Sequence, residues 1–72
     1  RNVLIAVGNT RAKDLLATCR RRLEDRSALV RGAAVWALGA LSAEAFLDER
    51  AQRRPHEAEP QVCEEWDAGP AA

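Results

Sequence analysis

Apolar residues in the first half of the chain recur at helical spacing. Between residues 11 and 24 they fall within about 120° of one another at 100° per residue. The members of this stripe are Ala12, Leu15, Leu16, Cys19 and Leu23. The pattern predicts one amphipathic helix over about 11–24, which Asn9 and Thr10 can cap at its start.

A second helical pattern, over about 28–41, is apolar on nearly every side. Its main stripe consists of Leu29, Val30, Ala33, Ala34, Ala37, Leu38 and Leu41. Val35 and Trp36 lie off this stripe, so neighbouring elements must cover the helix on more than one side. We therefore expect Trp36 to be packed inside the protein rather than to stack on a base. Asp25 or Ser27 can cap the first turn.

An internal repeat decides how the first residues should be interpreted. Taken alone, the apolar run at 3–8 could be a buried strand. Its sequence Val-Leu-Ile-Ala-Val-Gly returns 31 positions later as Ala-Val-Trp-Ala-Leu-Gly at 34–39. Similarity at this period predicts an α-solenoid of stacked helix pairs. The first run is then the end of a separate helix that stops at Gly8 and Asn9.

Two shorter helices are predicted in the second half of the chain. Ser42 is a good cap for a helix over about 43–54, which Pro55 ends. Pro60 suits the first turn of a terminal helix, in which Val62 and Trp66 can pin the tail onto the rest of the protein. We therefore predict an all-α chain with a repeat region over 1–43 and a helical tail over 44–72.

The charges are segregated along the chain, although its 72 residues sum to a net charge of zero. Residues 1–43 hold eight basic and three acidic side chains, a net of +5, and residues 44–72 carry −5. Long cationic side chains on one surface can neutralise nucleic-acid phosphates. Our candidates for such contacts are Arg1, Lys13, Arg20, Arg21, Arg22 and Arg31. The alternative is a solvated helix face with local pairs to acids, in which Arg31 ties the turn at Asp25.

Size and composition exclude several kinds of protein. A chain this short buries too little surface to form an enzyme with its own deep pocket, and it begins at Arg1 without any methionine. We therefore expect a piece of a longer protein. The longest apolar run, at 33–41, is far below the roughly 20 residues that a membrane span requires. Cys19 and Cys63 are too far apart for a local zinc or iron–sulfur motif, so we expect Cys19 in the core and Cys63 and His56 without a role.

Several motifs resemble a known family. Asp25-x5-Arg31, followed by Ala34-x2-Ala37-Leu38-Gly39-x-Leu41, resembles a HEAT-like repeat. The strings at 1–9 and 29–39, together with Glu59-Pro60-x-Val62-x-x-Glu65-Trp66, resemble the C-terminal HEAT-like module of the tRNA epoxyqueuosine reductases. One departure is Arg11-Ala12-Lys13, which stands where that family usually has a Gly-Asp-type link.

The resemblance implies a role in tRNA modification. Members of this family are cytoplasmic bacterial oxidoreductases that use cobalamin and two [4Fe-4S] clusters. They reduce epoxyqueuosine to queuosine at the wobble position of the tRNAs for Asp, Asn, His and Tyr. Their cofactor ligands and catalytic acid lie upstream of this module, so the resemblance assigns no catalytic, cofactor or metal residue to this chain.

The module itself would hold the anticodon stem-loop beside the upstream catalytic domains of the same chain. We expect it to be cytoplasmic and monomeric and not to contact a membrane. The alternative is a non-enzymatic HEAT-like scaffold for protein interactions, which the repeat alone would support.

Overall fold

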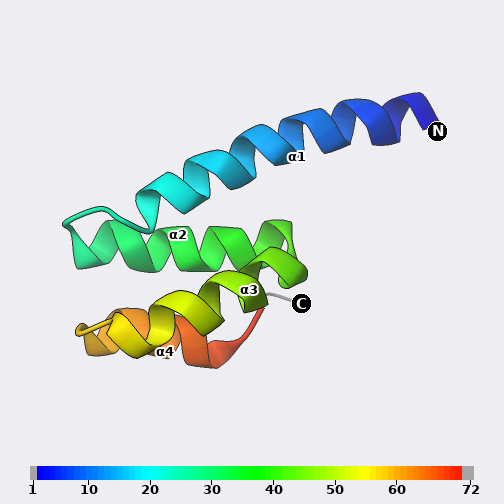
Figure 1. Ribbon diagram of the computed structural model, residues 1–72. Helices are drawn as coiled ribbons and strands as arrows, with labels where there is room; N and C mark the ends of the chain where they lie inside the picture. Colours follow the sequence, from blue (N-terminus) through cyan, green and yellow to red (C-terminus); the bar gives the residue numbers. More distant parts are fainter. Residues whose placement is uncertain (1, 71–72) are drawn as a thin grey trace.

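The computed structural model describes the backbone of residues 2–70 and the side chains of residues 11 and 13–70. Its helices are α1 (Asn2–Arg22), α2 (Ala28–Leu41), α3 (Ala43–Arg53), the short 3-10 helix η1 (Arg54–His56) and α4 (Pro60–Ala68). The described part of the chain contains no strand, so the prediction of an all-α protein is confirmed. Helix α2 lies in the middle, between α1 on one side and α3 and α4 on the other (Figure 1).

Helix α1 is a single continuous helix from Asn2 to Arg22. The prediction that one helix ends at Gly8 and Asn9 and another begins after them is therefore wrong. A glycine in a helix interior costs only about 1 kcal/mol relative to alanine, and no proline in this segment forces the backbone to stop. The first turns of α1 extend past the end of α2 (Figure 1).

Helix α2 has the predicted bounds, Ala28–Leu41, and of the two candidate caps Ser27 is its N-cap. The Oγ of Ser27 accepts a hydrogen bond from the backbone N–H of Val30 at 3.4 Å. The Oδ1 of Asp25 accepts one from the backbone N–H of Ser27 at 2.8 Å. These two bonds fix the turn between α1 and α2, because side-chain oxygens replace the carbonyl partners that a first helical turn lacks.

The second half of the chain also starts its helices where the sequence predicts. The Oγ of Ser42 accepts from the backbone N–H of Ala45 at 3.1 Å and caps α3. The α-helical geometry ends at Arg53, and the 3-10 turn of η1 carries Pro55. Pro60 is the first residue of α4, whose end is marked by Gly69 at a φ of 84°. A positive φ favours glycine, because other residues meet a steric clash with their Cβ there.

The core lies where α2, α3 and α4 meet. Its largest fully buried side chains are Trp66, Phe46, Leu38, Val35 and Val62. The rings of Phe46 and Trp66 are tilted by 53°, with centroids 5.1 Å apart, a favourable geometry for an aromatic pair. Val62 and Trp66 therefore anchor the tail as predicted. Cys19 of α1 and Leu23, which directly follows α1, belong to the same cluster, which confirms Cys19 as a core residue.

One face of α2 has no cover among the described residues. The buried side of this helix is formed by Ala34, Val35 and Leu38. By contrast, Trp36 is 62% exposed and Leu29 is 80% exposed. The predictions that Trp36 packs inside the protein and that Leu29 belongs to the core stripe are therefore wrong for this chain. Helical periodicity identified the apolar faces of α2, but α1, α3 and α4 cover only part of its circumference.

Candidate nucleic-acid interface

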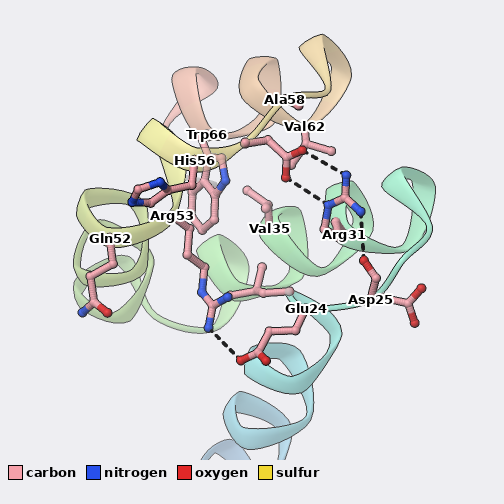
Figure 2. A pocket seen from close by; sticks show the side chains of 12 residues that line it. Glu24, Asp25, Arg31, Val35, Gln52, Arg53, His56, Ala58, Val62 and Trp66 are labelled. Carbon is pink, nitrogen blue, oxygen red and sulfur yellow. Dashed lines mark hydrogen bonds and ion pairs between the residues drawn. The ribbon is translucent and has the colours of Figure 1, made fainter.

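Arg31, one of the predicted phosphate contacts, is engaged by the protein itself. Its Nε and Nη2 donate to Oε1 and Oε2 of Glu57, both at 3.0 Å. Its Nη1 donates to the backbone carbonyls of Asp25 at 2.9 Å and Arg26 at 3.0 Å. Figure 2 shows this guanidinium between the turn and the chain before α4. Arg31 does tie the turn at Asp25, but through the backbone carbonyl and not the carboxylate.

The pairing also changes the acidity of Glu57. Hydrogen bonds from Arg31 hold the pKa of the Glu57 carboxyl below its ordinary value, because protonation would break them. The backbone N–H of Glu59 also donates to Glu57, at 3.0 Å, and acts in the same direction. The Arg31–Glu57 pair is thus a bidentate ion pair, a geometry that only arginine among the cations provides.

Arg20 is part of a second ion-pair network, which joins α1 to α3. Its Nε lies 3.1 Å from Oε2 of Glu49, whose other oxygen lies 2.7 Å from Nε of Arg53. Glu49 is the single buried charged residue in the described part of the chain. Arg53 also reaches Glu24, in the turn after α1, at 3.2 Å. Arg20 therefore stabilises a buried carboxylate in addition to any role at the surface.

The arginines of the acidic half are largely paired as well. Arg54 forms two parallel contacts to Asp67, at 3.0 and 3.2 Å, which join η1 to α4. Arg54 thus offsets the exposed carboxylate of Asp67, whereas Arg53 offsets the buried carboxylate of Glu49. Exposed pairs of this kind add little stability, but they determine which cations remain available to a ligand.

Five cations form what we call the basic surface: Arg11, Lys13, Arg21, Arg22 and Arg26. All are exposed, and none has an acidic partner within 4 Å among the described residues. The surface includes three of the six predicted candidates, while Arg20 and Arg31 are paired and Arg1 lies outside the described residues. Arg11 and Arg26 were not predicted, although the charge excess of the first half already pointed to them.

The basic surface wraps around the outer side of α1 rather than following one line. At 100° per residue, Arg21 lies opposite the core-facing residues Cys19 and Leu23. Lys13 lies toward the edge that carries Arg20, and Arg11 and Arg22 lie on the other edge. Asp14 is the one exposed acid of α1 between them. The arrangement suits contact with a curved, negatively charged backbone from more than one side.

A hollow of about 600 Å³ lies between the α1–α2 turn, η1 and α4 (Figure 2). Its cationic walls are Arg31 and Arg53, which Glu57 and Glu24 already neutralise. His56 is at its rim and is exposed. Three carboxylates, Glu24, Asp25 and Glu57, line this hollow beside its two guanidinium groups. It is therefore a poor site for a phosphate.

The chain lacks the donors that the implied iron–sulfur clusters require. Cys19 is buried in α1, where burial raises the pKa of its thiol. Cys63 lies on α4, and its Sγ contacts the carbonyl of Glu57 at 3.5 Å. A [4Fe-4S] cluster takes four thiolates, and no metal-binding group of three or more His, Cys, Asp or Glu forms within the described ranges.

Comparisons with known proteins do not assign a function to this chain. No helix in the described part of the chain is long and apolar enough to cross a membrane. Comparisons with family models, curated proteins and solved structures find no match to this chain.

The Arg31–Glu57 pair predicts a dependence of stability on pH. A carboxyl whose pKa is lowered by folding stabilises the protein above its unfolded pKa, near 4.3, and this stabilisation is lost as the pH falls toward the folded pKa. We expect Glu57→Gln to lower the free energy of unfolding at pH 7 and to reduce its loss between pH 5 and 3. Urea unfolding followed by circular dichroism measures both.

Glu64→Gln is the matched control, because Glu64 is exposed and forms no ion pair among the described residues. It should follow the unmodified chain at every pH. If the free energy of unfolding fell by the same amount between pH 5 and 3 in the unmodified chain and in Glu57→Gln, the assigned role of the pair would be contradicted.

Proposed function

We propose that this chain is a HEAT-like helical module that docks the anticodon stem-loop of tRNA in an epoxyqueuosine reductase. The observation that carries the proposal is the separation of unpaired charge. Around α1 and the following turn, the five cations of the basic surface outnumber two acids without an ion pair, Asp14 and Asp25. Along α3 and α4 the unpaired acids are Glu44, Asp48, Glu59, Glu64 and Glu65, and the cation without an ion pair there is Arg50.

This separation of charge determines which side of the module would face RNA. Cations that contact phosphates release condensed counterions, which yields affinity that is salt-dependent and largely independent of sequence. The acidic helices α3 and α4 would be repelled by the same phosphates. An RNA stem is therefore steered to the α1 side of the molecule, although the chain as a whole is neutral.

The turn between α1 and α2 supports the HEAT-like part of the proposal. The Asp25 and Arg31 of the motif meet there, and Arg31 donates to two carbonyls of the turn. The two helices on either side pack against each other, as the helices of a repeat do. The solenoid of further stacked pairs remains part of the proposal.

Within such an enzyme, this module would bind and position, and the upstream domains would carry out the reduction with the cobalamin and clusters that the resemblance implies. Its contribution is to hold the stem so that the wobble nucleotide is presented to the catalytic domain. Positioning of this kind lowers the entropic cost of the reaction. No described residue of this chain is assigned to the chemical step.

A protein-interaction scaffold is the second candidate, because one apolar face of α2 is open. Leu29 and Trp36 on that face are too exposed to serve the core of this chain. Exposed apolar residues that share a face are typical of protein contacts. This candidate requires no basic surface, so RNA binding separates the two.

The RNA-binding test removes two cations of the basic surface. We expect Lys13→Ala with Arg21→Ala to weaken binding of a fluorescent anticodon stem-loop at low salt. Since each phosphate contact contributes about 0.7–0.9 to the slope of log K against log salt, that slope should fall by about 1.4 to 1.8. Fluorescence anisotropy over a range of salt concentrations measures both quantities.

The matched control, Arg50→Ala with Arg54→Ala, removes the same charge from the acidic half and should leave the affinity nearly unchanged. An unaltered affinity and salt slope in the Lys13 and Arg21 variant would show that the basic surface is ordinary solvated protein and would remove the support for RNA docking.

The family assignment has a separate test. If the chain belongs to an epoxyqueuosine reductase, the reading frame upstream of Arg1 in the genomic DNA encodes a cluster motif of the form C-x2-C-x2-C-x3-C-P. Sequencing that region decides the question. A frame that encodes only further 31-residue helical repeats would instead favour the non-enzymatic scaffold.

A further inference from the structure

The hollow between the α1–α2 turn, η1 and α4 combines an apolar lining with polar atoms that are not all used by the protein itself. Its volume of about 600 Å³ lies in the range of sites that bind small molecules. The apolar part of the lining consists of Leu23, Val35, Ala58, Val62 and the ring of Trp66. The polar atoms that remain available determine what the hollow can bind.

The indole N–H of Trp66 is one of these atoms. Trp66 is only 1% exposed, and no hydrogen bond joins its Nε1 to a described residue. Among the buried and half-buried residues that the structure describes, no side-chain nitrogen or oxygen is both fully buried and unpaired. The small exposed area of Trp66 therefore includes Nε1. Since Trp66 lines the hollow, and Figure 2 shows its nitrogen on the edge of the ring toward Arg31, this N–H requires an acceptor from a ligand in the hollow.

Two carboxylates of the α1–α2 turn supply free acceptors at the same hollow. Glu24 uses one oxygen for the guanidinium of Arg53. Asp25 uses one oxygen for the backbone N–H of Ser27. In each case the second oxygen accepts no hydrogen bond from a described residue, whereas both oxygens of Glu57 are bonded to a guanidinium. Because three carboxylates and two guanidinium groups line the hollow, it favours a cation.

We propose that this hollow binds a lysine side chain of a partner protein. The peptide carbonyl of the bound lysine accepts from Nε1 of Trp66. Its methylene stem lies against the apolar lining at Val35, as the stems of long cationic side chains commonly do. Its ammonium group donates to the free oxygens of Glu24 and Asp25. The single lysine of this chain, Lys13, does not line the hollow, so the bound lysine belongs to another polypeptide segment.

The free acceptors favour lysine over arginine. An arginine pairs best with a carboxylate through two parallel hydrogen bonds, which require both oxygens of one group. Neither Glu24 nor Asp25 has both oxygens available. A lysine ammonium carries three donors that point in different directions, so it can bond single oxygens of separate carboxylates.

The hollow is distinct from the basic surface. None of the five cations of that surface lines it, although Arg22 and Arg26 are close to Glu24 in the sequence. A phosphate would be repelled by the excess of carboxylates that attracts an ammonium group. Binding of a lysine here is thus independent of RNA docking, and either can fail without the other.

NMR of the ¹⁵N-labelled chain tests the proposal, with Nα-acetyl-lysine amide as the probe. The chain has two tryptophans and therefore two indole N–H signals, which Trp36→Phe assigns. We expect the signal of Trp66 to shift in a saturable manner as the probe is added. The signal of Trp36, which is exposed and does not line this hollow, should stay in place.

Three related probes separate the contributions of the bound group. Nα-acetyl-norleucine amide lacks the ammonium group, n-butylamine lacks the carbonyl, and Nα-acetyl-arginine amide carries the planar fork. Since a hydrogen bond contributes about 0.5–1.5 kcal/mol, and more when one partner is charged, each should bind about fivefold more weakly or worse.

The variant Glu24→Gln with Asp25→Asn removes the two charges and should raise the Kd of the lysine probe about tenfold. Asparagine keeps an acceptor for Ser27, so circular dichroism should show an unchanged fold. The matched control, Asp48→Asn with Glu64→Gln, removes two exposed charges that do not line the hollow and should leave the Kd nearly unchanged.

Three results would overturn the proposal. The first is a Trp66 signal that does not move when the lysine probe is added. The second is binding of any of the three related probes as tight as that of the lysine probe. The third is an unchanged Kd in the variant of Glu24 and Asp25.

Discussion

One guanidinium group joins three parts of this chain: the turn after α1, the first turns of α2 and the segment before α4. Arg31 lies in the first turns of α2, yet it bonds two carbonyls of the turn after α1 and both oxygens of Glu57 before α4. Its planar fork can satisfy these acceptors at the same time, which an ammonium group cannot do. The junction thus holds Glu57, just before α4, whose Trp66 packs against Phe46.

Ion pairing of arginines also determines which cations remain without an acidic partner on the surface. Arg20, Arg53 and Arg54 are engaged by acids, and the last two offset charge in the acidic half of the chain. The cations around α1 have no such partners among the described residues. A chain of zero net charge thus presents one basic side, and that asymmetry supports docking of RNA more directly than the total charge suggests.

The sequence predicts the local features of this fold well and the distant ones poorly. Ser27, Ser42 and Pro60 mark helix starts through bonds or dihedral angles within four residues, and the structure places each where the sequence does. The predicted helix end at Gly8 is wrong because glycine lowers helix stability only slightly, so the helix continues through it. The exposure of Trp36 could not be read from periodicity, which identifies apolar faces but not what covers them. The pairing of Arg31 with Glu57 spans 26 positions and has no local signature.

Native-state hydrogen exchange of Arg31→Lys tests the central role of this junction most directly. Lysine keeps the charge but cannot bond Glu57 and the two carbonyls together. In the unmodified chain, the amides of α4 should exchange as slowly as those of α2, because both helices share one core. In Arg31→Lys, we expect α4 to exchange faster than α2, because the tail opens on its own. Equal protection of α4 and α2 in this variant would contradict it.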